Sequence, residues 1–148
     1  MASHGKFVEK PEDYGALFQW GRKGDGHEQR TCLLHSGTVS SGFDSNGQIL
    51  SGQPAYGKFI NASSSPFDWR SPKIDNLWDS GTESSPVKTA NDPCPTGWRV
   101  PTKDELKSLI DSGSECKPDF NGESGRLFGS GANNIFLPAA GARSGYDG

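Results

Sequence analysis

The stretch NDPCPTGWRVPTKDE, residues 91–105, has the features of a structural junction. Its three prolines fix an extended backbone, because the proline ring restricts φ and removes the amide donor. Gly97 lies among them and permits a tight bend, since glycine has no Cβ. The stretch is therefore predicted to serve as a scaffold rather than as a ligand-binding loop.

The side chains after this bend are expected to alternate. Trp98 and Val100 are two residues apart, so on a strand they would point to the same side, which we expect to face the interior. Arg99 would then face the other way, toward a carboxylate such as Asp92 or Asp104.

A helix is predicted within VPTKDELKSLIDSG, residues 100–113. Thr102 is the expected N-cap, and Glu105, three residues later, completes a capping box. Asp104 and Glu105 lie in the first turn, where the helix dipole favours negative charge. Gly113 is expected to end the helix in a left-handed conformation. An apolar face is formed by Leu106, Leu109 and Ile110; because the helix is only about ten residues long, it should need tertiary packing.

The composition indicates one ordered, loop-rich domain rather than a helical bundle. The 148 residues include 20 Gly and 10 Pro, and 10% are aromatic, so an aromatic core can form around few aliphatic side chains. The net charge of −3 gives no basic surface for nucleic acid. No apolar run approaches the roughly 20 residues of a membrane span.

Upstream of residue 91, regular structure is sparse. Residues 1–13 are polar and are expected to be a flexible segment. The alternation of Ala16, Phe18 and Trp20 fits a half-buried strand or a helical turn. Residues 29–66 lack periodicity, although Asn46-Gly47 predicts a turn. Residues 66–86 interleave aromatic residues with prolines and predict a long loop pinned by aromatic anchors.

Downstream of the predicted helix, two segments are expected. Residues 112–134 are rich in Gly, Ser and Asn and are predicted to be a loop. Residues 135–148 are apolar at first, and Pro138 limits them to an edge or bulged strand.

Three blocks of this chain resemble the Fibrobacter succinogenes major paralogous domain, which occurs in secreted and surface proteins of Bacteroidetes-type bacteria. They are YGALFQWGRKGDGHE (14–28), NDPCPTGWRVPTKDE (91–105) and FLPAAGARSG (136–145), in family order. The most specific positions form the CPTGWRVPT signature: Cys94, Gly97, Trp98, Arg99 and Pro101. The resemblance implies a C-type-lectin-like α+β fold with a small twisted antiparallel sheet, one or two short helices and much loop. It also implies an extracellular or cell-surface location.

The resemblance further implies that residues 14–148 are a single domain that is incomplete at its C-terminus. Family members continue past FLPAAG with a tyrosine- and tryptophan-rich stretch and a closing strand that carries a cysteine. That cysteine is the natural partner of the one at Cys94, so Cys94 would be orphaned here, and Cys32–Cys116 would be a candidate second bridge. From the residues alone, three cysteines are equally compatible with buried free thiols and with one disulfide plus a lone thiol.

The aromatic residues of the long loop are candidates for ligand binding. Phe67, Trp69, Trp78 and Tyr146, with Tyr56 as a further candidate, could form a platform that stacks on sugar rings or contacts a protein partner. The alternative is that these side chains fill a small core and anchor the loop.

Metal binding and catalysis have weaker signals. Asp119, Asn121 and Glu123 alternate in DFNGES and are the best local calcium candidates, although such mixtures commonly make turns. No other cofactor is expected. His27 follows Asp25 in a turn and is expected to be solvated or to cap the backbone rather than to act in catalysis. No nucleophile, zinc or phosphate-loop motif is present.

We therefore expect a non-catalytic binding module that recognises a glycan or a protein ligand through long loops. One alternative is a fimbrial or fibre-tip assembly subunit, completed by a strand from a partner chain or by a second copy. Another follows from WRVPTKDE, which also resembles a stretch of the formylglycine-generating sulfatase-modifying enzymes; their copper-binding cysteine motif has no match here.

Overall fold

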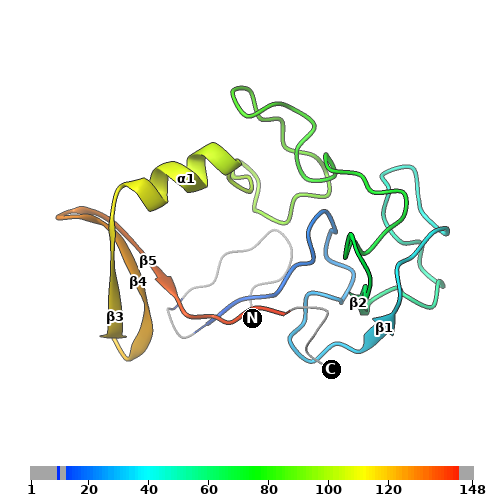
Figure 1. Cartoon of the computed structure of the whole chain (residues 1–148), viewed down its shortest axis with the longest axis horizontal. Coiled ribbons are helices and arrows are strands. Elements are labelled where there is room, and N and C mark those ends of the chain that lie inside the picture. Colours follow the sequence, from blue (N-terminus) through cyan, green and yellow to red (C-terminus); the bar gives the residue numbers. More distant parts are fainter. Residues whose placement is uncertain (1–9, 11–12, 144–148) are drawn as a thin grey trace.

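The helix expected from the capping box is present in the computed structural model, which describes residue 10 and residues 13–143 (Figure 1). This helix, α1, runs from Lys103 to Asp111, and the Thr102 side chain accepts a hydrogen bond from the Glu105 amide. The Glu105 carboxylate in turn accepts from the Thr102 amide, so the capping box is confirmed. Gly113 has a φ of 83°, which confirms the left-handed residue at the end of the helix.

Tertiary packing covers the apolar face of α1 only in part. Leu109 is half-buried and the helix contacts the strand at residues 123–130, but no residue of α1 is fully buried; Leu106 is 45% exposed and Ile110 is 65% exposed. Local interactions also hold the helix. They are the capping box, the Lys107–Asp111 ion pair one turn apart, and the bidentate contact of the Arg99 guanidinium with Glu105.

The segment after α1 forms a three-stranded antiparallel sheet rather than the predicted loop. The strands are β3 (Ser114–Phe120), β4 (Glu123–Ser130) and β5 (Asn133–Pro138), in the order β3-β4-β5. Asn121 and Gly122 join β3 to β4 with φ values of 55° and 90°. These positive values are those of the two-residue turn that Asn-Gly favours, and the right-handed twist of that turn suits a hairpin.

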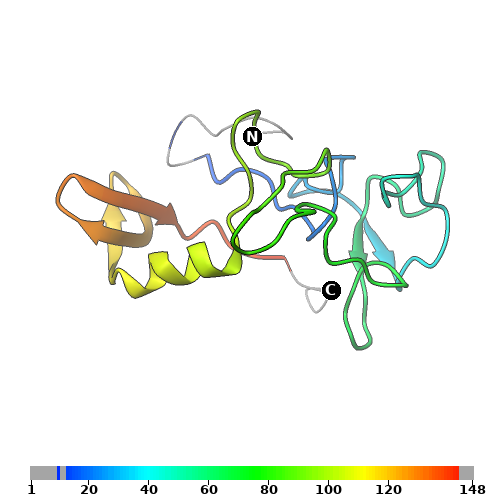
Figure 2. The ribbon, with the colours of Figure 1, turned by 90° about the horizontal axis from the view of Figure 1, so that it is seen from above.

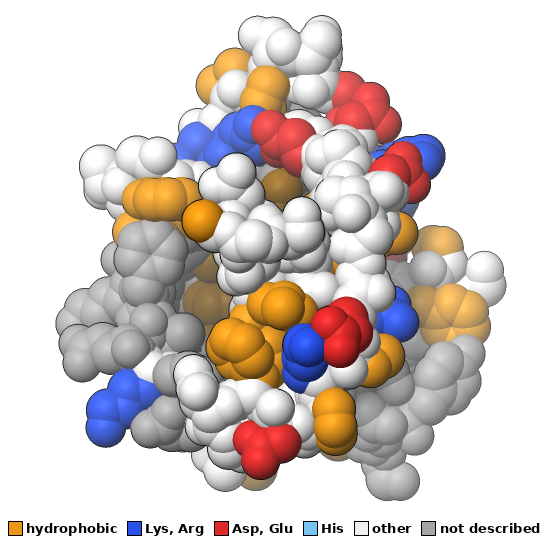
Figure 3. Space-filling view, turned by 90° about the vertical axis from the view of Figure 1, so that its left-hand side faces the viewer, with side chains coloured by type: hydrophobic (Ala, Val, Ile, Leu, Met, Phe, Trp, Pro, Cys, Tyr) orange, Lys and Arg blue, Asp and Glu red, His pale blue; other side chains and the backbone are white. Residues whose placement is uncertain are grey.

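Strand β5 lies at the edge of this sheet, as predicted, and ends at Pro138. The Phe136 ring stacks on the Phe120 ring with centroids 4.5 Å apart. Gly125 of β4 makes this possible, because a Cβ there would lie 2.5 Å from the Phe136 ring. Figure 3 views this end of the molecule and shows hydrophobic side chains at its surface.

The other end of the molecule holds the buried core in a loop-rich part of the chain (Figure 2). Two short strands, β1 (Leu34–Ser36) and β2 (Phe59–Asn61), form a parallel pair there. Each has three residues, too few to give a periodic signal in the sequence. The core beside them consists of Ile49, Ala55, Ile60, Trp69 and Leu77. Together the helix and the two sheets make an α+β fold.

Two predictions for this part are confirmed and one is wrong. The Asn46-Gly47 turn is present, with Phe43 and Ile49 bridged on either side of it. Residues 66–86 form no helix or regular strand, and buried aromatic side chains anchor them. The strand or helical turn expected at Ala16, Phe18 and Trp20, however, is not formed: residues 14–19 are irregular, and Trp20 begins a hydrogen-bonded turn and is 57% exposed.

The block at residues 91–101 forms an irregular junction, and not the strand expected at Trp98 and Val100. Gly97 has a φ of 82° and bends the chain, as predicted. Asp92 is 3% exposed and accepts hydrogen bonds from the amides of Cys94 and Val100 and from the Lys88 ammonium.

Trp98 lies between the two amides that Asp92 binds. Its side chain is turned outward and is 62% exposed, which corrects the expected inward orientation. Arg99 pairs with Glu105, and not with Asp92 or Asp104. The Arg99 guanidinium is therefore bound at the N-terminal cap of α1 and not at either of the carboxylates that the sequence suggested.

The three cysteines are free, so the Cys32–Cys116 bridge is not formed. The Arg143 guanidinium donates to the Cys32 sulfur at 3.0 Å, and the Arg126 guanidinium lies 3.5 Å from the Cys116 sulfur. Each of these two thiols therefore lies against a cation rather than against another thiol.

Arg30 joins the two ends of the described chain. Its guanidinium donates to the carbonyl oxygens of Tyr14, Gly15 and Ala140 at 2.8–3.0 Å. The predicted flexible segment, residues 1–13, lies almost wholly outside the described residues. In the described part, no helix has the length and apolar character needed to cross a bilayer.

Candidate functional site

A buried polar network organises the loops around Trp20. Arg22 is 1% exposed, and its guanidinium donates to Asp25 Oδ2 at 2.5 Å, to the Lys58 carbonyl at 2.7 Å and to Gln19 Oε1 at 3.0 Å. The other oxygen of Asp25 lies 2.7 Å from His27 Nδ1. One carboxylate therefore neutralises a buried guanidinium and orients a buried imidazole.

His27 is fully buried, so of the two expected roles solvation is wrong, whereas capping of the backbone is confirmed. Its Nε2 accepts a hydrogen bond from the Gln19 amide at 3.1 Å, so this nitrogen carries no proton and Nδ1 donates to Asp25. Burial lowers the pKa of His27, and the hydrogen bond to Asp25 opposes this only in part. The imidazole is therefore neutral in the folded protein and is engaged at both nitrogens.

The pKa of Asp25 is held well below its ordinary value. Burial alone would raise it, but the hydrogen bond from His27 and the charge of Arg22 outweigh that effect. Asp25 is thus a carboxylate throughout the physiological range.

Asp25, His27 and Glu28 are also the residues whose arrangement comes nearest to a metal site in the described part of the chain. Their ligand atoms lie within 4.8 Å of one another. Those atoms already have hydrogen-bond partners in the protein: His27 Nδ1 donates to Asp25, and Glu28 Oε2 accepts from the amides of Asp25 and Gly26. The trio therefore acts as a structural cluster that closes the turn.

The calcium candidates also lie in a turn. Asp119 and Glu123 lie near the facing ends of β3 and β4, with Asn121 in the turn between them. Asp119 Oδ1 accepts from the Gly122 amide at 2.8 Å, and the Glu123 carboxylate accepts from the Tyr14 hydroxyl. The structure thus gives these side chains a role in the hairpin and in its attachment to residue 14.

Two of the predicted binding aromatics belong to the core. Trp69 is 4% exposed and Trp78 is 7% exposed, so for these two residues the alternative of core-filling loop anchors is confirmed, and the open platform is not. Their indole N–H groups donate to the carbonyls of Trp20 and Arg22, at 2.7 and 2.9 Å. These bonds satisfy the polar edge of each buried indole, which is why both can serve as loop anchors.

The remaining candidates are dispersed. Phe67 is 52% exposed and Tyr56 is 40% exposed, and neither lines the aromatic cavity described next. Tyr146 lies outside the described residues. The expected platform is therefore not assembled from these residues.

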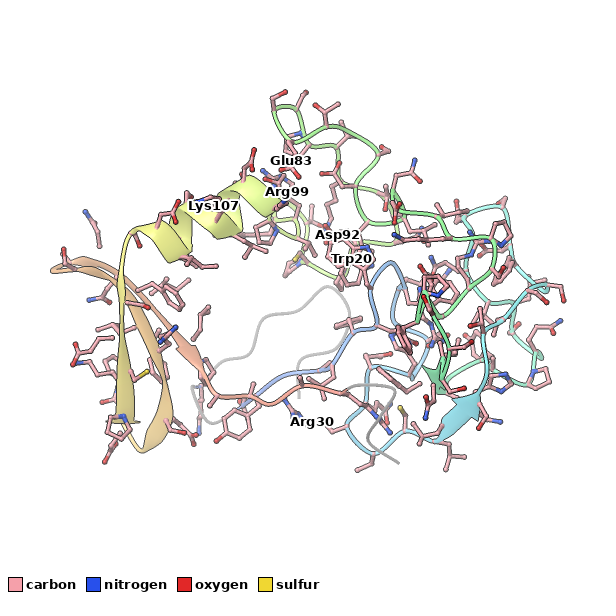
Figure 4. All side chains as sticks on the ribbon, viewed as in Figure 1. Trp20, Arg30, Glu83, Asp92, Arg99 and Lys107 are labelled. Carbon is pink, nitrogen blue, oxygen red and sulfur yellow. The ribbon has the colours of Figure 1, made fainter. Side chains whose placement is uncertain are left out.

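An aromatic cavity does exist, and Trp20 is its exposed ring. The rings of Trp20 and Trp78 are 4.7 Å apart between centroids, with 55° between their planes. They border a cavity of about 250 Å³ that lies between the loop at residues 75–83 and the start of α1. In Figure 4, Glu83 and Arg99 lie above Trp20 at this end of the helix.

The rim of this cavity is acidic. Asp75, Asp79 and Glu83 line it from the loop, and Lys103 lines it from α1. Asp79 Oδ1 accepts from the amides of Gly81 and Val87, both at 2.7 Å, and so shapes the loop. Glu83 Oε2 accepts from the Asp104 amide at the N-terminus of α1, which ties the loop to the helix.

No protein-family model, curated protein or solved structure matches this chain. The cavity beside Trp20 is therefore interpreted from its own residues. Sequence reasoning left Trp20 on a half-buried strand or a helical turn. It did not connect Trp20 with residues 75–83, because the contact depends on the indole of Trp78, which lies 58 positions later in the chain.

Proposed function

We propose that this protein is a non-catalytic binding module that recognises a glycan at the Trp20 cavity. The observation that supports this is the half-exposed indole of Trp20, held against the buried indole of Trp78. The apolar face of a sugar ring stacks on such an indole, and the acidic and hydroxyl groups nearby accept or donate hydrogen bonds. The resemblance to a C-type-lectin-like domain of bacterial surface proteins agrees with this role.

Several features of the site favour binding over catalysis. The Trp20 ring already packs against the Trp78 ring, so the stacking of a ligand on Trp20 costs little ordering of the protein. Thr82 adds a hydroxyl to the rim, and the carboxylates can accept from sugar hydroxyls. His27, the histidine paired with a carboxylate, is fully buried and has both ring nitrogens engaged, which leaves it unsuited to proton transfer with a ligand.

Replacing Trp20 with alanine tests the proposal. We expect W20A to weaken glycan binding by about tenfold or more, because loss of one stacking ring removes about 1.4 kcal/mol or more of binding free energy. Isothermal titration calorimetry with a panel of short oligosaccharides measures this. The matched control is Y56A, which removes an exposed aromatic ring outside the cavity and should bind as the parent does. Equal affinity of W20A and the parent would contradict the proposal.

A second candidate function is assembly through the uncovered apolar surface. Leu106 and Ile110 of α1 and Ile135 and Leu137 of β5 are each more than 40% exposed. Apolar side chains that a monomer leaves uncovered commonly mark an interface, and an edge strand can pair with another chain. A second copy of this chain is the simplest partner.

Native mass spectrometry tests this second candidate. If the apolar surface joins two copies, the parent should be a dimer, and I110K should shift it toward the 15.8 kDa monomer. D111N, which changes a charge at the end of the same helix, is the control and should leave the dimer intact. A parent that stays monomeric at high concentration would exclude self-assembly through this surface.

A further inference from the structure

We infer that the ligand of the Trp20 cavity carries a positive charge, as an amino sugar with a free amine does. This inference rests on the proposed glycan function and names the class of glycan. It combines an acidic rim, carboxylate oxygens that the fold does not use, and an exposed indole within one cavity.

The charge of the cavity is the first observation. Three carboxylates, Asp75, Asp79 and Glu83, line it together with one ammonium, that of Lys103, so its lining carries two more negative than positive charges. Lys73, which is not part of the lining, pairs with Asp75 at 2.6 Å and offsets one of these charges, so an excess of one negative charge is left. Arg99 does not offset it, because its guanidinium already holds both oxygens of Glu105 at 2.6 and 2.7 Å.

The second observation is that the fold uses one oxygen of each rim carboxylate. The oxygens in use are Asp75 Oδ1, which faces the Lys73 ammonium, Asp79 Oδ1, which accepts from two amides, and Glu83 Oε2, which accepts from the Asp104 amide. Within the described part of the chain the other oxygen of each makes no hydrogen bond. Three carboxylate oxygens thus remain as acceptors for the N–H groups of a ligand, and charge-assisted bonds of this kind are roughly twice as strong as neutral ones.

Trp20 supplies the third observation. A tryptophan ring is the best aromatic partner for a cation, and an ammonium near an indole gains from the negative face of the ring. The same ring binds the apolar face of a sugar. A ligand that combines a sugar ring with an ammonium group therefore uses both properties, whereas an anionic sugar is repelled by the rim. At about 250 Å³, the cavity is on the scale of one sugar ring.

Three oligosaccharides that differ at one position test the inference. The probes are β-1,4-linked oligomers of glucosamine, N-acetylglucosamine and glucose of the same length, which carry an ammonium, a neutral amide and a hydroxyl at C2. We expect the glucosamine oligomer to bind the parent about tenfold more tightly than the other two. Its affinity should fall as salt is added and as rising pH removes the proton from the amine.

Neutral variants of the rim assign the effect to this cavity. In the double variant D75N/E83Q, the glucosamine preference should disappear while binding of the neutral oligomers is retained, because the side-chain amide oxygen introduced at position 83 can still accept from the Asp104 amide. The matched control is E115Q. Glu115, like Asp75, is an exposed carboxylate paired with a lysine, but it lies on β3, outside the cavity.

The outcomes separate the inference from the proposed function. Neutral oligomers that bind as tightly as the glucosamine oligomer would overturn the charge preference and leave glycan binding in place. A glucosamine preference that survives in D75N/E83Q would also overturn it, since the charge would then be recognised elsewhere. Failure of all three oligomers to bind would count against the glycan function itself.

Discussion

Replacing Arg22 with alanine is expected to lower the free energy of unfolding by about 3–5 kcal/mol, the range found when one partner of a buried ion pair is removed. The side chains of Arg22 and Asp25 are 1% and 6% exposed, so R22A leaves the Asp25 carboxylate buried without its cation. The Lys58 carbonyl and Gln19 Oε1 also lose their donor. Urea unfolding, followed by tryptophan fluorescence, measures the change.

Two variants complete this test. R22K keeps a positive charge but lacks the planar fork of donors, so it should be destabilised less than R22A and remain measurable if R22A does not fold. K73A breaks the exposed Lys73–Asp75 pair and should leave the urea midpoint almost unchanged, since solvent screens such pairs. An R22A midpoint equal to that of K73A would show that the network does not hold the fold.

The same network should make the fold sensitive to acid in two stages. In the unfolded chain His27 gains a proton as pH falls below its ordinary pKa of 6.5, but in the folded protein burial lowers that pKa. The unfolded state therefore binds more protons, and the free energy of unfolding declines as pH falls below about 6.5.

The second stage comes from Asp25. The lowered pKa of its folded carboxylate makes the unfolded state bind more protons again once pH falls below the ordinary value of 3.8. Each unit of difference in pKa corresponds to about 1.4 kcal/mol of stability. Stability should thus be highest above about pH 6.5 and should fall in both windows as the solution is acidified.

Urea midpoints measured from about pH 8 to about pH 3 test both stages. H27Q should remove the decline just below about pH 6.5 and keep the later one. H35Q, which replaces a histidine in strand β1, is the matched control and should retain the decline assigned to His27. An H27Q profile identical to that of the parent would refute the assignment.

The sequence predicted best where local interactions decide the structure. The start and end of α1 follow from Thr102, Glu105 and Gly113, which act on their own backbone neighbours. The edge strand ending at Pro138 and the turn at Asn46-Gly47 are local in the same sense. Each depends on the conformational preferences of a few adjacent residues.

The predictions from sequence were least accurate where contacts between residues distant in the chain determine the structure. The hairpin at Asn121-Gly122 was missed, although its turn carries the same dipeptide signal as Asn46-Gly47, because polar residues mask the alternation in its strands. The burial of Trp69 and Trp78 depends on carbonyls of Trp20 and Arg22, some 50 residues earlier. The cavity at Trp20 could not be foreseen for this reason.

The sheet β3-β4-β5 has a consequence for how the chain folds. Its strands follow one another directly, joined by short turns, and α1 immediately precedes them. Closing such short loops costs little chain entropy, so this unit can form early. The loop-rich part depends on contacts such as those of Arg22 with Lys58 and Trp20 with Trp69, which require long loops to close first. The Trp20 cavity, which needs both parts, is therefore completed late, when the slower part of the chain reaches the helix.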